Sequence, residues 1–450
     1  MNKIVLKITF QIYHQVKGTK VYRKLKELRN NQWLSKKEIE KLQHKKLVSL
    51  LQHAYKNVPF YRKRFKEAGL KLSDLEKREV LKDIPFLTKK DINENLMDLL
   101  AINIKKKQLI PNSTSGSTGE SLYFYTDMNS WAWRRATEIR NKEWLNVFLG
   151  DKIIKLWGAP IDIKRANSVR NRIHSWFNNY IILSSYELSK PSMEQYIEII
   201  NRFKPTLLVS YPGPLTEFSK FIIQNKIKVT SSIKAIISSA ETLYQWQKDI
   251  IEQAFHCPVY NRYGCREFGD VAQDCLFREG LHINAERVIV EIVNDDFKSC
   301  KPNETGEIII TDLDNYGMPF IRYKIGDLGA FSDKSCECGR GLPLLKTIEG
   351  RTLDVIKTPE GNRLGGTFWT LLFRSKPGIK SFQVIQEDIN GIVVRYVREE
   401  NYKGIPKEYF IKKIKEKCGE DFRIEFIEVS KIPKTKSGKT RFVISKLKNE

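Results

Sequence analysis

The sequence has few cysteines, no long apolar run and a deficit of acidic residues. Its seven cysteines are an odd number scattered through 450 residues, which argues against the disulfide framework of a secreted protein. No window holds the roughly 18 apolar residues that a membrane span needs. A short apolar patch at the N-terminus is broken by Lys7, and no small-residue cleavage site follows it, so we read no signal peptide. These absences predict a soluble, cytoplasmic protein.

Positive charge dominates, with 78 Lys and Arg residues against 53 Asp and Glu residues and a net charge of +25. Basic chains often bind nucleic acid, anionic lipid or phosphorylated ligands. Here the basic residues are scattered among acidic ones, so we assign most of them to a solvated surface and expect no nucleic acid partner. The N-terminal region up to Arg29 is basic enough for a peripheral membrane contact, which we keep as a minor alternative.

The hydrophobic pattern is typical of a layered α/β protein. From about residue 150, apolar strand-like runs that end in turns alternate with amphipathic helix-like runs, which indicates parallel strands covered by helices. Residues 35–70 are expected to be helical, with a break at "NVP". Residues 129–147 are a Trp-rich helix candidate whose aromatic side chains we assign to the core, and residues 282–331 are richer in strand.

The chain beyond Gly350 has a different pattern. There "FQVIQEDINGIVVRYV" predicts a hairpin, "KEYFIKKIKEKCG" a helix and "RIEFIEV" a strand, which together make a small α+β piece. We therefore expect a large domain over 1–350, helical over its first stretch, residues 1–110, and a small domain over 358–450. Residues 351–357 are expected to form the hinge between them.

The stretch "STSGSTGES" at 113–121 is rich in glycine and hydroxyl groups. Gly116 and Gly119 permit backbone conformations closed to other residues, and successive N–H groups in such a turn can surround an anion. It is not a Walker A loop, because the Gly-Lys-Ser/Thr ending is absent. By composition a flexible linker is an equal alternative. The flanking runs look like strands that meet at a hairpin, which weighs against a linker.

Two further segments carry candidate chemistry. The tail "PKTKSGKTR" presents Lys439, but Pro433 stands where a Walker A loop needs its first glycine, and a basic tail is the plain alternative. Elsewhere three thiols and one imidazole could form a closed tetrahedral zinc site. Their spacing matches no standard finger, so unliganded buried thiols are the alternative. The four residues are Cys275, His282, Cys336 and Cys338.

Five short motifs follow one another in an order that carries more information than each alone: "STSGSTGES", "YGCREFG", "YKIGD", "GRTLD" and "PKTKSGKTR". Together they resemble the successive core motifs of the adenylate-forming (ANL) superfamily of acyl- and aryl-CoA synthetases. More narrowly the chain resembles the phenylacetate–CoA ligase family, in its capsular-polysaccharide-biosynthesis (CapK-like) branch. "LLQHAYKNVPFYRKRF", "SAETL" and "CGRGLP" are similar to that family too, so the resemblance spans about residues 40 to 445.

The resemblance implies a fold and a nucleotide site. The fold is α/β, a large N-terminal adenylate-forming domain with layered α/β subdomains and a β-rich part, followed by a small mobile α+β C-terminal domain. The loop over the β- and γ-phosphates of ATP would consist of Thr114, Ser115, Gly116, Ser117, Thr118 and Gly119. Further ATP-binding residues would be Ser239, Ala240, Glu241, Tyr263, Gly264, Asp327 and Arg351.

Three more residues gain roles from the resemblance. Glu267 would ligate Mg²⁺, Asp354 would lie at the hinge, and Lys439 would be the catalytic lysine of the small domain. These roles agree with the chemistry, because attack of a carboxylate on the α-phosphate joins two anions, and a lysine and Mg²⁺ stabilise the charge on the phosphoryl oxygens. A lysine on a hinged domain can also be withdrawn to admit a second substrate.

The implied function is ATP-dependent, AMP-forming activation of a carboxylic acid, an aryl acid by the family's example, and acyl transfer to a thiol, CoA. The chain departs from the usual CoA ligases after "GRTLD" and is closer there to the capsule branch. An amine or hydroxyl acceptor in polysaccharide or metabolite assembly is therefore a second hypothesis. A non-catalytic basic scaffold is a third, which intact Glu267, Asp327 and Lys439 disfavour.

The resemblance also bears on the metal, the pocket and the assembly. Some members of the family carry a structural zinc at positions similar to the Cys/His set above, which favours zinc over free thiols. Ligands bind at strand ends in α/β sheets, so we expect Trp157 and Tyr211, which follow two strand-like runs, near the acid-binding cleft. The oligomeric state is left open, with a dimer as one option.

Overall fold

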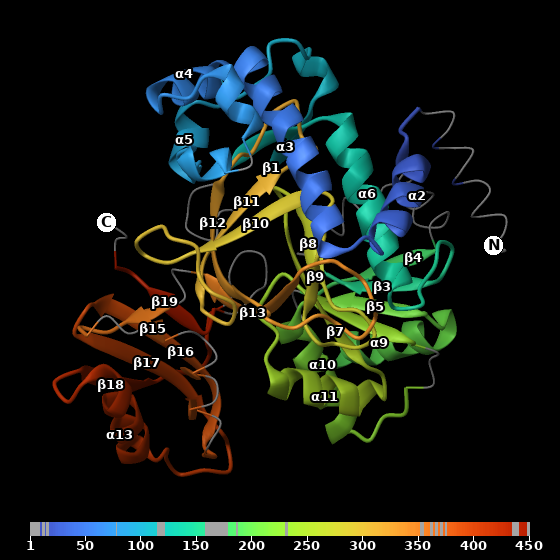
Figure 1. Ribbon diagram of the computed structural model, residues 1–450. Coiled ribbons are helices and arrows are strands. Elements are labelled where there is room, and N and C mark those ends of the chain that lie inside the picture. The colour runs from blue at the N-terminus through green and yellow to red at the C-terminus, as the bar shows by residue number, and fades with distance from the viewer. Residues whose placement is uncertain are drawn as a thin grey trace. The chain divides into compact units, whose positions relative to one another are not determined.

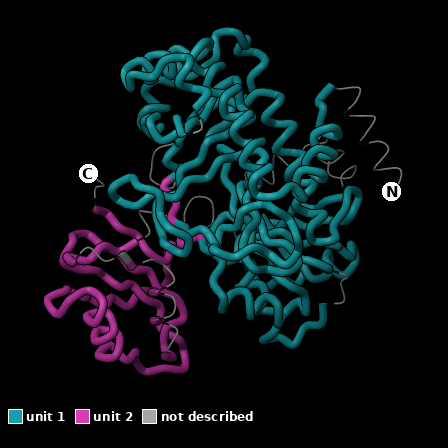
Figure 2. The backbone as a smooth tube through the Cα atoms, in the orientation of Figure 1, with its two compact units in different colours: residues 1–325, 329–347 teal, residues 326–328, 348–450 magenta. Residues whose placement is uncertain are grey.

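The computed structural model describes residues 10, 14, 18–77, 79–114, 122–157, 179–185, 188–229, 233–351, 355–360, 363–364, 368–369, 372–373, 376–433 and 441–447. The chain divides into two compact units, one of residues 1–325 with 329–347 and one of residues 326–328 with 348–450 (Figure 2). No helix among the described residues is long and apolar enough to cross a membrane.

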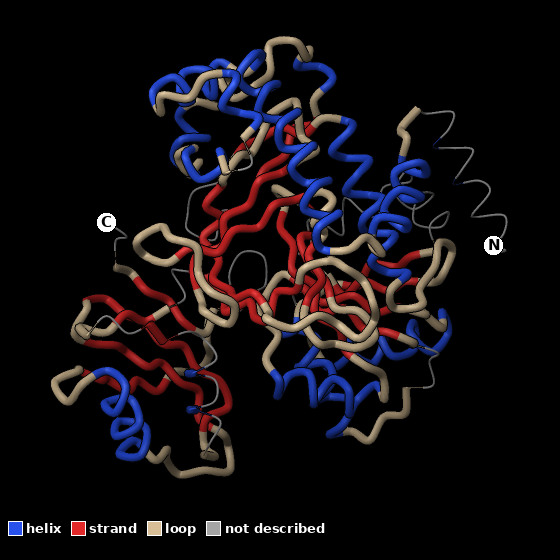
Figure 3. The backbone as a smooth tube through the Cα atoms, in the orientation of Figure 1, coloured by secondary structure: helices blue, strands red, loops and turns tan. Residues whose placement is uncertain are grey.

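The first unit mixes helices and strands (Figures 1 and 3). Its helices are α2 (Val21–Asn31), α3 (Lys36–Asn57), α4 (Pro59–Glu67), α5 (Lys89–Glu94), α6 (Met128–Glu143), α9 (Lys190–Phe203), α10 (Pro212–Gln224) and α11 (Gln245–Phe255). Its first strands are β1 (Ile110–Ser113), β2 (Tyr123–Thr126), β3 (Ile153–Leu156), β4 (Tyr180–Leu183), β5 (Leu207–Ser210), β6 (Ala235–Ser239) and β7 (Val259–Cys265). The later strands are β8 (Gly269–Gln273), β9 (Leu281–Ile283), β10 (Val288–Val293), β11 (Gly306–Asp312), β12 (Tyr323–Phe331) and β13 (Leu344–Arg351), and the last two extend into residues grouped with the second unit.

The main sheet has eleven strands in the order β10-β11-β12-β13-β9-β8-β7-β6-β5-β3-β4. Strands β4, β3, β5, β6 and β7 pair in parallel, whereas β7 pairs antiparallel with β8, and β8 with β9. The register places Leu156 opposite Ser210 and Ser210 opposite Ser238. The carboxyl ends of these parallel strands therefore form one row at the same edge of the sheet, the usual ligand-binding edge of an α/β protein.

The parallel strands are buried on both faces. Ile154, Leu208 and Ile236 pack with residues of α9, α10 and α11 on one face. Their chain neighbours Leu207 and Ile237 belong to a separate cluster with Leu145 and Val147. Since successive side chains of a strand point to opposite faces, burial of both faces requires the near-continuous apolar runs of this part of the sequence.

The N-terminal helices confirm the predicted break at "NVP". Ser35 begins α3 with a capping box, because its hydroxyl accepts from the Glu38 backbone while the Glu38 carboxylate accepts from the Ser35 N–H at 2.8 Å. Helix α3 ends at Asn57, and Pro59 opens α4, where a missing N–H costs no helical hydrogen bond.

The described part of the second unit contains a four-stranded sheet, a two-stranded sheet and a helix of 12 residues. Its elements are β14 (Ile356–Lys357), β15 (Arg363–Leu364), β16 (Ile379–Asp388), β17 (Gly391–Arg398), α13 (Lys407–Cys418), β18 (Arg423–Glu428) and β19 (Val443–Ser445). The sheet order is β18-β17-β16-β19, with the predicted hairpin β16–β17 at its centre. Trp369, Val384 and Phe410 lie in its core. The predicted fold class, α/β with a small α+β C-terminal part, is confirmed.

Some details differ from the sequence-based expectation. The stretch "HINAERVIVEIV" looks like one strand-like run in the sequence but forms two strands, β9 and β10. Residues 284–287 separate them, because Asn284 and Arg287 are buried polar residues engaged in side-chain contacts. The run "LTEFSKFIIQNK" predicts a helix that begins at Leu215, whereas α10 begins at Pro212, since proline is favoured in a first turn.

A fully buried ion pair ties α6 to the strand-rich part of the first unit. Arg140 donates to the Glu286 carboxylate at 2.9 Å and to the Asn284 side chain at 2.7 Å, and the Arg140 and Glu286 side chains are 0% and 1% exposed. Two charges taken out of water in this way must remain paired, because either one alone bears the whole cost of desolvation.

Arg140→Met is expected to lower the free energy of unfolding by about 3–5 kcal/mol, because it leaves Glu286 as an uncompensated buried charge. Denaturant titration followed by tryptophan fluorescence measures the change. Lys63→Met is the control, since Lys63 faces Glu67 across 3.9 Å with both side chains in solvent and its loss should change little. Equal effects of the two substitutions would contradict the assignment.

Candidate functional site

A β-hairpin brings together the two ends of the predicted phosphate loop. Strands β1 and β2 pair antiparallel, with Ser113 opposite Tyr123. Beyond this pair, the Thr114 N–H donates to the Leu122 carbonyl at 2.9 Å, and the Thr114 hydroxyl accepts from the Leu122 N–H at 3.1 Å. The segment is therefore held at both ends by a hairpin. Ser115, Gly116, Ser117, Thr118 and Gly119 lie outside the described residues.

The predicted "SAE" residues lie where β6 ends. The buried Ser239 hydroxyl donates to the Arg262 carbonyl on β7 at 2.9 Å. Ala240 has φ of +69°, a left-handed conformation that turns the chain sharply at the strand end. The Glu241 carboxylate accepts from the Gly213 N–H at 3.3 Å, in the first turn of α10, where the helix dipole favours negative charge.

Tyr263 and Gly264 lie on the neighbouring strand. The register pairs Ser239 with Arg262, which places Tyr263 just beyond the end of β6. The β7–β8 register shifts between Tyr263 and Gly264, and a Cβ at Gly264 would lie 2.6 Å from the Gly269 carbonyl oxygen. Only glycine fits this close approach of two backbones. Tyr263 itself is 8% exposed.

Two aromatic side chains from the same row of strand ends are stacked. Trp157 follows β3 and Tyr211 follows β5, and their ring centroids lie 4.0 Å apart with planes inclined by 27°. The parallel register brings them together, because Leu156 and Ser210, the residues before them, are partners. The two residues expected near the acid-binding cleft are thus neighbours at the edge where the parallel strands end.

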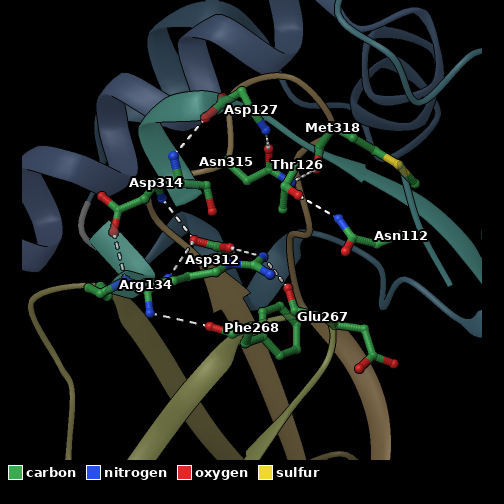
Figure 4. Close-up of polar contacts among 12 residues, drawn as sticks. Asn112, Thr126, Asp127, Arg134, Glu267, Phe268, Asp312, Asp314, Asn315 and Met318 are labelled. Atoms are coloured by element: carbon green, nitrogen blue, oxygen red, sulfur yellow. Dashed lines mark hydrogen bonds and ion pairs between the residues drawn. The ribbon is translucent and has the colours of Figure 1, made fainter. Parts of the chain in front are cut away.

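Glu267 lies in the turn between β7 and β8, whose backbone is held from behind. Arg134 on α6 donates to the carbonyls of Arg266 and Glu267, and Arg287 donates to the Phe268 carbonyl at 3.2 Å. Figure 4 shows the Glu267 side chain projecting away from these contacts. The residue is 8% exposed, and its carboxylate has no hydrogen bond or ion pair with any described residue.

The two arginines share one buried carboxylate. Asp312, whose side chain is 0% exposed, lies 3.4 Å from Arg134 and 4.0 Å from Arg287. Burial lowers the pKa of Arg134, and the charge of Asp312 opposes that effect. Sequence reasoning missed these three residues. The only local signal was the acidic run that ends the apolar strand "IIITDLD", which by itself is ordinary.

The segment after Asp312 also holds the base of the hairpin. Asp127, which caps α6, accepts from the N–H groups of Tyr316 and Gly317 at 2.8 and 2.9 Å, and its own N–H donates to the Asn315 side chain at 3.2 Å. The Asn315 amide donates in turn to the Tyr125 carbonyl at 3.0 Å. The hairpin and the Glu267 turn are thus both fixed to α6 and residues 312–318 (Figure 4).

Two further residues predicted to bind the nucleotide lie on β12 and β13, which are neighbours in the main sheet. Asp327 lies on β12 and is half-buried, next to Gly326, whose φ is +79°. Arg351 is the last residue of β13, and its side chain is outside the described part of the structure. Asp354 and Lys439 also lie outside the described residues.

The structure brings the four predicted zinc ligands together. Cys275 follows β8, His282 lies on β9, and Cys336 and Cys338 lie between β12 and β13. One ligand atom from each lies within 4.8 Å of all the others, with the Cys275 and Cys336 sulfurs 3.6 Å apart and the Cys338 sulfur 3.3 Å from His282 Nε2. Burial, with Arg340 nearby, lowers the pKa of His282 to about 4, so its ring is neutral at pH 7.

These distances suit a tetrahedral zinc ion. Zinc–sulfur bonds of about 2.3 Å in a tetrahedron place two sulfurs roughly 3.8 Å apart, close to the separation of Cys275 and Cys336. The donor set, three thiols and one imidazole, is a usual one for structural zinc. The sequence spacing alone did not identify the site, because its members come from three separate segments that the antiparallel strands align.

Comparison with known proteins places the fold. Residues 356–446 match a family model described as the CapK C-terminal domain. The chain is 28% identical to protein CapK of Staphylococcus aureus, over 99% of this chain and 97% of CapK. It is 25% identical to the phenylacetate-coenzyme A ligase of Escherichia coli (strain K12), over 71% of this chain and 72% of that ligase.

Solved structures share the architecture at low sequence identity. 2-Hydroxyisobutyryl-CoA ligase in the postadenylation state, in complex with R3-HIB-AMP, has a TM-score of 0.74 at 18% identity, over 92% of this chain and 90% of that one. ATP-bound MatB from Rhodopseudomonas palustris has a TM-score of 0.56 at 15% identity, over 76% of this chain and 68% of that one. At these identities the likeness concerns the fold.

Proposed function

We propose that this chain is an acid–thiol ligase. It belongs to the adenylate-forming superfamily and, within it, to the CapK-like branch of the phenylacetate–CoA ligase family. In the first step a carboxylate attacks the α-phosphate of ATP, forming an acyl-adenylate and releasing pyrophosphate. In the second step a thiol, CoA, attacks the acyl carbon, forming a thioester and releasing AMP. The family's example suggests an aryl acid, and the cytoplasm, where ATP and CoA are available, is the expected location.

One observation carries the proposal. The hairpin that ends in Thr114 and the turn that presents Glu267 are both fixed to α6 and residues 312–318, although they lie far apart in the sequence. Such shared anchoring suits two loops that must act on the same polyphosphate group, since catalysis of phosphoryl transfer depends on positioning. The "SAE" strand end and Tyr263 lie on the adjacent parallel strands.

Different residues of the chain would bind the metal, the phosphates and the ribose. Glu267 offers a carboxylate without a partner among the described residues, which fits an ion such as Mg²⁺ that usually takes one or two carboxylates and keeps several waters. When bound, Mg²⁺ would neutralise charge on the phosphates. Thr114 and the 115–119 loop would donate hydrogen bonds to the β- and γ-phosphates. Asp327 would accept from the ribose hydroxyls.

The small domain would supply the movable cation. We propose a domain boundary at the hinge 351–357, with Asp354 within it, and a small domain over 358–450 that brings Lys439 to the phosphate during adenylation. Arg351 would contribute a second positive charge to nucleotide binding. This division of labour explains how a glycine-rich loop without a Walker lysine can serve ATP, because the lysine comes from a distant part of the chain.

Lys439→Ala is expected to slow ATP–pyrophosphate exchange by at least about 100-fold, because one cation that stabilises transition-state charge is worth that much. The measurement is incorporation of labelled pyrophosphate into ATP with a panel of aryl and alkyl acids. Lys431→Ala, an exposed lysine in the same region, is the control and should keep the wild-type rate. No exchange with any acid, in either wild type or variant, would favour a non-catalytic scaffold.

The coverage of the relatives favours a second candidate for the acceptor. The similarity to CapK extends over 99% of the chain, whereas that to the phenylacetate-coenzyme A ligase covers 71%, and the matched C-terminal family model is that of CapK. The alternative is therefore an enzyme of cell-surface polysaccharide or related assembly that adenylates its acid and transfers the acyl group to an amine or a hydroxyl.

CoA is expected to stimulate AMP release in the presence of an acid that supports exchange, with a new acyl-CoA detected by mass spectrometry. The physical reason is that the thiolate consumes the adenylate, which otherwise stays bound. Hydroxylamine is the control, since it traps any activated acyl group. If hydroxylamine traps the acyl group but CoA is never acylated, the amine or hydroxyl acceptor replaces the thiol.

We further propose that the Cys/His cluster holds one structural zinc ion. The cluster fits zinc because its four donor atoms lie within 4.8 Å of one another and three of its members are buried. It lies apart from the strand-end row, since it joins β8, β9 and the segment before β13. Its role would be to fix these antiparallel elements to one another.

Protein purified without chelator is expected to contain one zinc per chain, and Cys338→Ser should reduce that content and lower the melting temperature. Elemental analysis by plasma mass spectrometry gives the ratio. Cys300→Ser is the control, since Cys300 lies outside the cluster and should keep the metal. Wild-type protein that neither contains nor takes up zinc would refute the site.

A further inference from the structure

The backbone of the turn that presents Glu267 is held by two arginine side chains. Three successive carbonyls, those of Arg266, Glu267 and Phe268, accept hydrogen bonds from two guanidinium groups, Arg134 and Arg287. When consecutive carbonyls are all engaged on one side, the backbone of the turn has little freedom to rotate. The side chain of Glu267 is directed the other way, as Figure 4 shows.

The two guanidinium groups are themselves fixed. Both pair with Asp312, and Arg287 also donates to Asp314 at 3.3 Å. Asp312 accepts from the Asp314 N–H at 3.0 Å, and Asp314 pairs with Lys46 of α3 at 2.9 Å. The side chains of Asp312, Asp314 and Arg287 are at most 2% exposed, so water cannot replace these contacts.

Side-chain packing also restrains the turn. The Phe268 ring is fully buried and meets Phe320 edge-on at 5.6 Å. Gly269, with φ of +71°, lies against the aliphatic part of Arg134, where a Cβ would approach Arg134 Cγ to 3.4 Å. Arg134 therefore contacts the turn through both its charged end and its stem.

We infer that Arg134 is a positioning residue for metal binding, which holds the 266–268 turn so that the Glu267 carboxylate is already oriented for Mg²⁺. Arg287 and Asp312 support it. The inference rests on the proposed role of Glu267. Arginine is required here because a planar group with five donors in a fixed fork can engage two carbonyls and a carboxylate together, whereas the ammonium of lysine is a single compact point. Residues that orient a metal ligand typically affect metal affinity 10- to 100-fold.

Arg134→Lys is expected to raise the apparent KM for Mg²⁺ in pyrophosphate exchange by about tenfold, with kcat at saturating Mg²⁺ largely kept. Two measurements that do not need turnover accompany it. Titration of the enzyme with Mn²⁺ in the presence of ATP, followed by electron paramagnetic resonance, should show a similar loss of affinity for the metal. Hydrogen exchange of the peptide covering residues 263–273 should be faster, because the turn has lost hydrogen bonds that hold it.

Arg135→Lys is the matched control. Arg135 is the next residue on α6, pairs with Glu138 at 2.7 Å, and has no described contact with the turn, so all three measurements should equal those of the wild type. Arg287→Lys, which weakens the contact with the Phe268 carbonyl of the same turn, is the second variant in case Arg134→Lys does not fold, and it should show the same pattern. Melting temperatures verify that each variant is folded.

The outcomes separate two failures. Unchanged Mn²⁺ affinity in folded Arg134→Lys or Arg287→Lys would overturn the inference, whether or not hydrogen exchange becomes faster, because the turn would then not govern the metal. Glu267→Gln tests the premise: it should weaken Mn²⁺ binding more than Arg134→Lys does. If Glu267→Gln leaves the affinity unchanged, the proposed metal role of Glu267 fails, and the inference with it.

Discussion

A single carboxylate that water does not reach organises the centre of the first unit. Asp312 lies between Arg134 and Arg287 and accepts from the Asp314 backbone. Because charges in so dry a place must be matched, each partner is confined to a narrow range of positions. Through these partners the constraint reaches α6 and the turn of Glu267. Segments of the candidate site that lie far apart in the sequence are thereby fixed to the same buried group of residues.

Much of the architecture could be predicted from the sequence, because it depends on local chemistry. The apolar runs after residue 150 predicted parallel strands, and burial on both faces of these strands explains why the runs are so continuous. The hairpin around "STSGSTGES" was indicated by its flanking strands and is present as β1 and β2. The thiols and the imidazole of the Cys/His cluster were grouped by residue type, with support from the resemblance, and they meet in space.

Other features could not be predicted, because their causes are not local. Arg134 on a Trp-rich helix looks like any solvated arginine, and only the folded chain shows that it meets the carbonyl of Glu267. The contact of Glu241 with the N-terminus of α10 joins two loops that follow different strands. In each case the deciding partner is dozens of residues away in the sequence.

The contacts of Gln32 join segments of the chain that are synthesised at different times. Its side-chain oxygen accepts from Trp144 at 2.6 Å and from Arg340 at 3.2 Å, and its carbonyl accepts from the Gly341 N–H. A Cβ at Gly341 would lie 1.8 Å from the Leu34 carbonyl, so the two backbones touch. During translation the first helices therefore leave the ribosome long before the segment that completes their contacts. A nascent chain that stops before this segment lacks Cys336 and Cys338, and it also lacks the contacts of Arg340 and Gly341 with Gln32 and Leu34. The Cys/His cluster can therefore be completed only when nearly the whole first unit has been made.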